Sequence, residues 1–209
     1  MIGPSSSHTA GAVRLGALAR AIFGEQPSSA TLGLHGSFAS TGHGHGTDLA
    51  LVAGLLGYTP DDDRIRDAFA EAERAGLEVS FETVDLGVAH PNTAVLELVA
   101  SDGRRMRLVG SSLGGGDVLM TAIDDFEVEM SGELPTLVID HVDRPGEIAS
   151  VTSVLADAGA NIASMRVSRE ARGARALMLI ETDAPVSEDV AKRVAEAPGV
   201  TAVRNVAAV

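Results

Sequence analysis

The sequence predicts an α+β fold in two domains, because two different patterns meet near Gly132. Before Gly132 the chain is rich in glycine and carries every histidine except His141. After Gly132, short apolar strands alternate with helical patterns in a regular order. The full length of 209 residues suits two modest domains, each with its own core. We therefore expect an α/β domain over residues 1–132 and a second domain over residues 133–209.

The second domain is predicted to have the order βαββαβ. A helix that ends at Gly159 follows the first strand, and a helix capped by Ser187 precedes the last one. The apolar face of the first helix is formed by Ile148, Val151, Leu155 and Ala158. The strands are expected at 136–139, 163–167, 176–180 and 200–206, and in the second of them Ala163, Met165 and Val167 alternate with polar residues. This order is typical of a ferredoxin-like sandwich, in which two helices cover one antiparallel sheet.

The first domain is predicted to contain three helices and five strands. The helices are expected at 10–23, 47–56 and 62–75, each followed by a glycine that can end it. In the third helix Ile65, Phe69 and Ala72 fall on one side. The strands are expected at 31–37, 78–84, 94–100, 104–110 and 126–131. The pattern leaves their order in the sheet open.

The composition argues against several classes of function. A formal net charge of −13 disfavours nucleic acid, which is bound through clustered Lys and Arg, and it disfavours an anionic membrane surface. The absence of cysteine excludes a disulfide or a thiolate-bound metal cluster in this chain. No stretch approaches the ~20 apolar residues that span a bilayer. We expect a cytoplasmic protein.

A run of hydroxyl groups and an imidazole lies directly before the first predicted helix. It reads Ser5-Ser6-Ser7-His8-Thr9, after Gly3-Pro4. Helix N-termini leave backbone N–H groups unpaired and favour negative charge, so this loop can hold a carboxylate. An ordinary helix cap is the alternative, although a cap needs only one hydroxyl.

A second group of polar residues combines Gly36-Ser37 with residues 41–48, which lead into the next predicted helix. Its alternating glycines let the backbone approach a ligand closely. His43 and His45 suit acid–base chemistry or hydrogen bonding to a carboxylate, and Thr47 and Asp48 open the helix. A flexible surface loop is the alternative reading. A metal site would need at least a third ligand.

Three further segments carry polar groups. His90-Pro91-Asn92 precedes a strand and is also explained by a plain turn. The glycine-rich segment 111–116 lacks the Lys of a phosphate-binding loop, so a tight turn between strands is favoured. In the second domain, His141 and Asp143 follow the first strand, and Asn161 precedes the next one. We expect all three at the same end of the sheet, where they could converge on one small polar molecule.

These motifs together resemble the beta chain of bacterial iron–sulfur-dependent L-serine dehydratases. The resemblance rests on Gly3-Pro4-Ser5-Ser6-Ser7-His8-Thr9, on His35-Gly36-Ser37, on Gly44-His45-Gly46-Thr47-Asp48, on His90-Pro91-Asn92-Thr93 and on Ser112-Leu113-Gly114-Gly115-Gly116. It covers nearly the whole chain in the same order and spacing. The C-terminal part resembles an ACT domain, and the first domain resembles the allosteric substrate-binding domain of that family.

The resemblance implies a subunit of an enzyme that converts L-serine to pyruvate and ammonia without pyridoxal phosphate. A 4Fe-4S cluster on the alpha subunit would act as Lewis acid on the serine hydroxyl. By resemblance, the catalytic residues are His8, His45 and Asp48, and the substrate-binding residues are Ser5, Ser6, Ser7, Thr9, Thr47, His90 and Asn92. The effector-binding residues of the ACT domain are His141, Asp143 and Asn161. Related sensors often carry Asn at the position of Asp143, and an added carboxylate would repel a bound one.

The partners implied are an alpha subunit, L-serine and a second copy of the chain, paired through the ACT or the N-terminal domains. Two alternatives remain at this point. One is a stand-alone amino-acid sensor with paired ACT domains. The other is a metal hydrolase built on His8, His43, His45 and His90.

Overall fold

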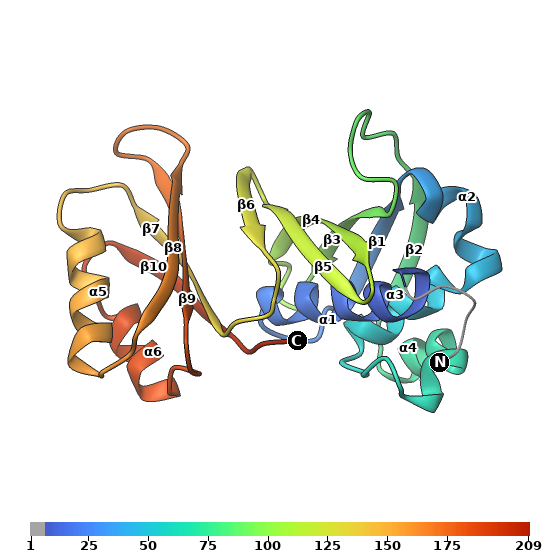
Figure 1. Ribbon diagram of the computed structural model, residues 1–209, viewed down its shortest axis with the longest axis horizontal. Helices are drawn as coiled ribbons and strands as arrows, with labels where there is room; N and C mark the ends of the chain where they lie inside the picture. The colour runs from blue at the N-terminus through green and yellow to red at the C-terminus, as the bar shows by residue number, and fades with distance from the viewer. Residues whose placement is uncertain (1–6) are drawn as a thin grey trace. The chain divides into compact units, whose positions relative to one another are not determined.

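The computed structural model describes residues 7–209, and for Ser7 and residues 41–45 it describes the backbone alone. The chain divides into two compact units (Figure 1). Unit 1 comprises residues 1–124, 129–131 and 209, and unit 2 comprises residues 125–128 and 132–208. Each unit is built on one sheet, of six and four strands respectively.

Unit 1 begins with a π-helical turn that runs directly into the first α-helix. Its helical segments are η1 (Ser7–Gly11), α1 (Ala12–Phe23), α2 (Gly36–His45), α3 (Thr47–Leu55), the 3-10 turn η2 (Asp63–Asp67) and α4 (Ala68–Arg74). Its strands are β1 (Ser29–Leu34), β2 (Glu78–Thr83), β3 (Thr93–Val99), β4 (Arg105–Gly114) and β5 (Asp117–Ile123). The sixth strand of the sheet, β6 (Phe126–Met130), is divided between the units, since residues 126–128 belong to unit 2. The six strands form one sheet in the order β2-β1-β3-β4-β5-β6.

The strands β1 and β2 are parallel, whereas β1 pairs antiparallel with β3, and β3 with β4. The connection between the two parallel strands contains α2, α3 and α4 (Figure 1). The carboxyl end of β1 therefore lies beside the start of β3 and the end of β4. Leu34 pairs with Ala94, and Thr93 pairs with Ser111.

Two glycines let α1 and α3 pack with their backbones in direct contact. A Cβ atom on Gly54 would overlap the carbonyl oxygen of Val13, and one on Gly16 would overlap that of Leu51. Farther along, Gly57 lies beside the guanidinium of Arg20, so the two helices run side by side in the same direction. Their N-termini consequently lie at the same end of unit 1.

Several predicted elements of unit 1 agree with the structure, but others do not. The glycines 24, 57 and 76 all have the left-handed backbone that ends a helix. The glycine-rich segment before Thr47 is helical rather than a loop, because α2 extends over it. The strand β5 was not predicted, and it forms a hairpin with β4 through Gly115 and Gly116. Of the three residues predicted to share one side of the third helix, Ile65 and Ala72 are buried but Phe69 is 42% exposed.

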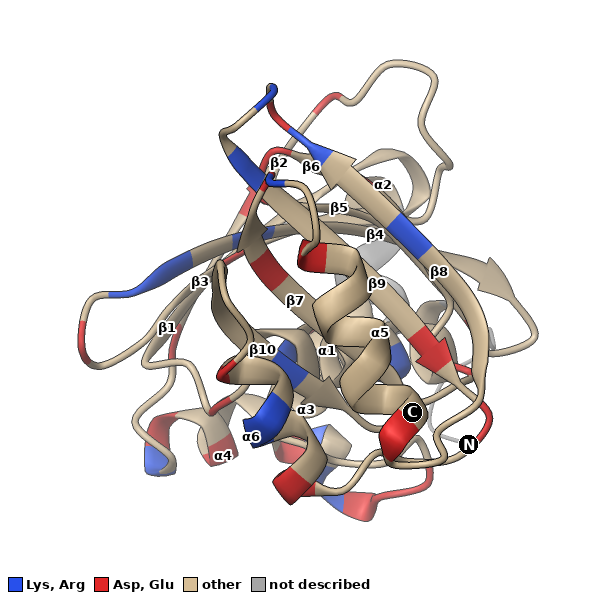
Figure 2. Ribbon diagram, turned by 90° about the vertical axis from the view of Figure 1, so that its left-hand side faces the viewer, with Lys and Arg blue, Asp and Glu red and all other residues tan. Residues whose placement is uncertain are grey.

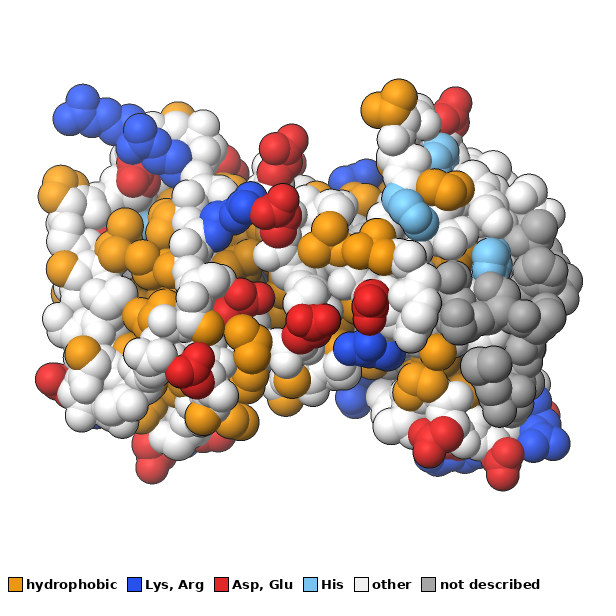
Figure 3. Space-filling view, viewed as in Figure 1, with side chains coloured by type: hydrophobic (Ala, Val, Ile, Leu, Met, Phe, Trp, Pro, Cys, Tyr) orange, Lys and Arg blue, Asp and Glu red, His pale blue; other side chains and the backbone are white. Residues whose placement is uncertain are grey.

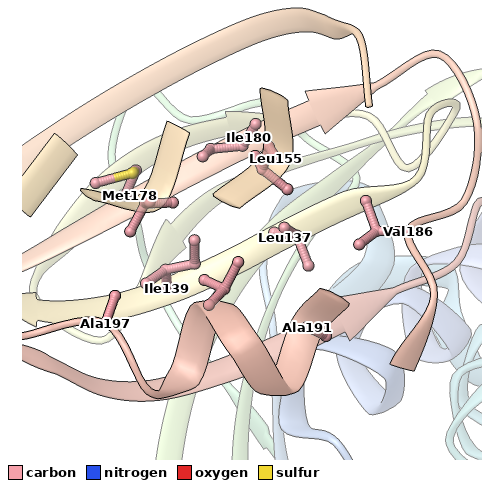
Figure 4. Packing of buried hydrophobic residues seen from close by; sticks show 10 residues of the cluster. Leu137, Ile139, Leu155, Met178, Ile180, Val186, Ala191 and Ala197 are labelled. Carbon is pink, nitrogen blue, oxygen red and sulfur yellow. The ribbon is translucent and has the colours of Figure 1, made fainter. Parts of the chain in front are cut away.

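Unit 2 has the predicted order of elements. They are β7 (Thr136–Val142), α5 (Glu147–Asp157), β8 (Ile162–Arg169), β9 (Arg175–Thr182), α6 (Glu188–Ala195) and β10 (Val200–Val206). The sheet is antiparallel in its pairings of β10 with β7, β7 with β9 and β9 with β8. Figure 2 shows both helices over the same face of this sheet. The core between them includes Leu137, Ile139, Leu155, Met178 and Ile180 (Figure 4).

The inner face of α5 is rotated from the predicted one. Ile148 is 42% exposed and Ala158 is also exposed, whereas Glu147 is buried together with Val151 and Leu155. The carboxylate of Glu147 occupies the space that a side chain on Gly199 would fill. A glycine in the loop before β10 therefore allows a charged residue to point inward.

The strand β8 is more exposed than its alternating pattern predicted. Met165 and Val167 point to the helix side of the sheet, since they pair with Ile180 and Met178 of the core. They nevertheless remain 42% and 37% exposed because β8 is an edge strand. Among the described helices, none is long and apolar enough to cross a membrane.

Candidate functional site

The polar segments of unit 1 gather at the carboxyl end of β1. The backbone N–H of His35, the residue after β1, donates to the carbonyl oxygen of Thr93 at 3.0 Å. The N–H of Ser37 at the start of α2 donates to the carbonyl oxygen of Pro91 at 2.7 Å. The η1 turn contacts α2, α3, β4 and β5 from the other side. Carboxyl ends of parallel strands are common ligand sites, because helix N-termini collect there.

His8 is the imidazole at the centre of this arrangement. Its Nε2 lies 3.2 Å from the hydroxyl oxygen of Ser37, and its ring packs edge-on against Phe38 with centroids 5.4 Å apart. The residue is only 7% exposed. The η1 turn and the start of α2 thus hold each other in place through one polar and one aromatic contact.

Three buried polar atoms at this end of the unit have no hydrogen-bond partner among the described residues. They are the hydroxyl oxygens of Thr9 and Thr47 and the side-chain oxygen of Asn92. Thr9 is 2% exposed and Thr47 is 0% exposed. An unpaired buried polar group costs about 1–3 kcal/mol, so a fold keeps one only where something offsets the cost. A polar ligand can provide these partners.

The surrounding polar groups, in contrast, are hydrogen-bonded within the protein. The hydroxyls of Thr93 and Ser111 lie 2.7 Å apart, and the side-chain amide of Asn92 donates to the carbonyl oxygen of Ser112. The buried carboxylate of Asp48 accepts from the N–H of Leu49 at 2.8 Å. These bonds fix the positions of Asn92 and Asp48.

His35 and Ser37 are site residues to which sequence reasoning assigned no role. The Nδ1 atom of His35 accepts from the N–H of Leu86 at 3.1 Å, so the ring ties the β2–β3 loop to the start of α2. A cavity of about 400 Å³ lies beside it, lined by His35, Gly36, Ala39, Ser40, Thr83, Val84 and Asp85. The motif His35-Gly36-Ser37 carried the family resemblance and was the signal that could have identified both residues.

The structure brings η1, with His8 and Thr9, into contact with α3, which begins with Thr47 and Asp48. Asn92 is linked to this contact through Ser112 of β4, a strand that also contacts η1. His90 is exposed, and its Nδ1 accepts from the N–H of Asn92 at 3.2 Å. Ser5 and Ser6 lie outside the described residues, as do the side chains of Ser7, His43 and His45. Among the residues the structure describes, no group of three potential metal ligands is found.

In unit 2 the three predicted effector residues do not converge within one chain. His141 pairs with Ala176 near one end of the sheet, whereas Asn161 precedes β8, whose first residue Ile162 pairs with Thr182 at the other end. The expectation that all three lie at the same end is therefore wrong, because β7 and β8 run in the same direction. The end of β7, with His141, and the start of β8, with Asn161, therefore lie at opposite ends of the sheet.

The side chains of Asp143 and Asn161 are already engaged. The Asp143 carboxylate accepts from the N–H of Gly173 at 3.1 Å and from Arg169 at 3.0 Å. The Gly173 N–H and then the Arg169 guanidinium hold the pKa of this carboxyl below its usual range. Asn161 donates to Asp183 at 2.7 Å. The Nε2 atom of buried His141, in contrast, has no partner in the described part of the chain.

Comparison with known proteins adds the family. Residues 1–78 match the family model of the serine dehydratase beta chain, and residues 136–199 match the ACT domain. The probable L-serine dehydratase beta chain of Bacillus subtilis is 40% identical over 207 residues, which are 99% of this chain and 94% of that protein. The chain belongs to the L-serine dehydratase beta chain family. It is therefore a subunit of a lyase.

Two other relatives illustrate the range of similarity. The L-serine dehydratase beta chain of Peptoniphilus asaccharolyticus is 38% identical over 91% of this chain and 86% of its own length. A D-3-phosphoglycerate dehydrogenase of Methanocaldococcus jannaschii is 36% identical over 48% of this chain but only 19% of its own length. Similarity to the dehydrogenase thus involves a part of that enzyme, whereas similarity to the beta chains involves almost all of each protein.

Proposed function

We propose that the end of unit 1 described above binds the carboxylate of L-serine and completes an active site on a separate alpha subunit. The observation that carries the proposal is the set of unpaired buried atoms on Thr9, Thr47 and Asn92. Thr9 on η1 and Thr47 on α3 belong to segments that contact each other, and Asn92 is bonded to Ser112 of β4, the strand that η1 also contacts. His8 and Ser37 form their pair on the same η1 turn and on α2. The hydroxyls of Thr9 and Thr47 would donate to the substrate carboxylate, and the side-chain oxygen of Asn92 would accept from its ammonium group.

The proposed reaction also needs a 4Fe-4S cluster, and the residues of this chain do not fit such a group. The sequence contains no cysteine, and thiolates are the usual ligands of such a cluster. We therefore assign the cluster ligands to the alpha subunit. The role left to this chain is to bind, orient and enclose the substrate.

Within that role the side chains divide by chemistry. His8 would stay close to the carboxylate through its hydrogen bond with Ser37, and Asp48 would accept from the substrate ammonium group. Ser5, Ser6 and Ser7 would add hydroxyl donors to the same carboxylate, and His90 would border the pocket. His45 would transfer protons, since imidazole is the side chain that titrates near neutral pH.

The test is anaerobic serine turnover with purified alpha and beta chains, alone and mixed. Turnover should require both chains.

His8→Ala should raise KM for serine about tenfold or more and leave association of the chains unchanged, because His8 is proposed to act on the substrate. His45→Ala should lower kcat instead. Thr152→Ala, an exposed change on α5, is the control and should alter neither constant. Turnover by the alpha chain alone would contradict the proposal.

For unit 2 we propose a homodimer that forms an effector site for L-serine. Two copies paired edge to edge through β8, about a twofold axis perpendicular to this strand, would have antiparallel β8 strands, so the start of β8 with Asn161 in one copy would lie on the side of the sheet that holds His141 in the other. The exposed apolar side chains of Met165 and Val167 on this edge support the pairing. Sedimentation of the beta chain should show a dimer that Met165→Lys with Val167→Lys dissociates, and a monomeric wild type would contradict it.

A further inference from the structure

The loop between β2 and β3 ends in an apolar tip. Val88 has 106% of its reference exposure, and Leu86 and Ala89 flank it in a segment that also contains Gly87. Figure 3 shows hydrophobic and histidine side chains next to one another over this loop. Single exposed apolar residues are common on protein surfaces, so Val88 alone indicates nothing. The hydrogen bonds that hold the loop and its position beside the candidate site are the observations that point to a function.

Hydrogen bonds hold both ends of the loop. On the β2 side, the N–H of Leu86 donates to His35, and the N–H of Gly87 donates to the carboxylate of Asp85 at 2.9 Å. On the β3 side, the hydroxyl of Thr93 donates to the carbonyl oxygen of His90 at 2.6 Å. Residues 86 to 89 are thus flanked on both sides by hydrogen-bonded turns, and the N–H of Leu86 is tied to His35. Surface loops usually expose polar residues, so a fully exposed valine at the tip of this loop points to a role in binding.

The loop also borders the candidate site. The carbonyl oxygen of Pro91 accepts from the N–H groups of Ser37 and Phe38 at the start of α2. Gly36 adjoins the same proline so closely that a Cβ atom would lie 2.8 Å from the Pro91 Cα. Ser37 in turn contacts His8. The tip at Val88 and the proposed substrate groups therefore stand on one connected framework.

We propose that this loop is a docking element for the alpha subunit, whose surface offers an apolar socket to Val88. The inference rests on the proposed function. Since this chain has no cysteine, the centre that completes the site must arrive on another polypeptide, and that polypeptide must approach the end of unit 1 that the loop borders. Because Val88 is fully exposed at this end of unit 1, covering its side chain with the partner's surface would contribute favourable free energy to association.

The test is the dissociation constant of the complex between full-length beta and alpha chains, measured anaerobically for a series at one position. An apolar socket predicts that Val88→Ile binds about as well as wild type, that Val88→Thr, which has nearly the same shape, binds several-fold more weakly, and that Val88→Asp binds at least tenfold more weakly. The melting temperature of the free beta chain should be unchanged throughout, because Val88 makes no buried contact. Phe69→Ser, at another exposed apolar position of unit 1, should leave the dissociation constant unchanged.

The outcomes separate the two proposals. If the wild-type chains associate and turn over serine, but Val88→Asp binds the alpha chain as tightly as wild type, the docking role is wrong and the proposed function stands. If the wild-type chains do not associate at all, both are wrong. If Val88→Asp changes only the self-association of the beta chain, the tip contacts a second copy and the proposed partner is wrong.

Discussion

The predicted binding residues of the two units differ in whether their polar atoms are already paired. In unit 1, Thr9, Thr47 and Asn92 each keep a buried atom without a partner in the described structure. In unit 2, Asp143 and Asn161 are engaged by Arg169, Gly173 and Asp183. Unit 1 therefore holds the unpaired groups from which the proposed receptor is built, and these groups lower the stability of the free protein. In unit 2 a ligand could pair directly with Nε2 of His141, but at Asp143 and Asn161 it would have to replace existing hydrogen bonds.

The ion pair of Asp143 with Arg169 weakens the repulsion that the sequence predicts between Asp143 and a ligand carboxylate. The negative charge of the Asp143 carboxylate faces the Arg169 guanidinium, so a ligand carboxylate nearby would meet an ion pair rather than an isolated charge. The pair is partly exposed, and such pairs contribute little to stability. At the proposed effector site, ligand binding would therefore depend more on His141 and on a second copy than on Asp143.

The largest expected effect concerns the contact between α1 and α3, the helix that begins with Thr47. Gly54→Ala should destabilise the chain by about 3 kcal/mol, because its Cβ would overlap backbone atoms of α1 that cannot rotate away. Thermal or urea unfolding measures the change. Gly76→Ala is the control, since Gly76 has a positive φ but open space around it, and it should cost only about 1–2 kcal/mol of backbone strain. Equal losses for the two variants would contradict the close helix packing.

In unit 2 the corresponding test addresses the buried Glu147. Gly199→Ala should cost about 2 kcal/mol, because the added methyl meets the Glu147 carboxylate and because the φ of Gly199 is +77°. In a Glu147→Ala background the same change should cost less, since only the backbone strain remains. Urea unfolding of the four chains in this double-mutant cycle measures the coupling. A coupling of zero would show that the two residues do not meet.

The smallest effect is the pH dependence that Asp143 contributes. Its pKa is lowered in the folded chain, so its contribution to stability is present above the ordinary carboxyl value and lost as the pH falls through the folded value. Between pH 7 and pH 3 the melting temperature of wild type should fall slightly more than that of Asp143→Asn. An identical fall in both chains would mean that Arg169 and Gly173 do not favour the charged form.

The sequence predicted the order of elements in unit 2 but not all of its burial. Periodicity identified the helices and strands because their apolar positions repeat regularly. It placed Ile148 on the buried face and did not identify Glu147 as buried, because the space for an inward carboxylate is left by Gly199, far along the chain. Similarly, the pattern of β8 could not reveal that the strand lies at the edge of the sheet.

In unit 1 the site was predictable in part. The hydroxyl and imidazole groups before the first helix and at the start of the third were recognised from their clustering. The contact of His8 with Ser37 was not, because it joins residues 29 positions apart through the fold. The second helix was missed because Gly42, Gly44 and Gly46 are typical of loops. Close contacts with neighbouring segments, such as that between Gly36 and Pro91, decide the local structure instead.

The receptor in unit 1 is tested most directly by Thr47→Val, which replaces one unpaired hydroxyl by a methyl group of the same size. Because that hydroxyl is fully buried and lacks a partner among the described residues, its removal should stabilise the free chain by about 1 kcal/mol. In the complex with the alpha subunit it should raise KM for serine about tenfold. Thr182→Val, whose hydroxyl donates to Ala184 at 2.9 Å, should instead destabilise the chain and leave KM unchanged. A Thr47→Val chain that is less stable than wild type and binds serine normally would contradict the account.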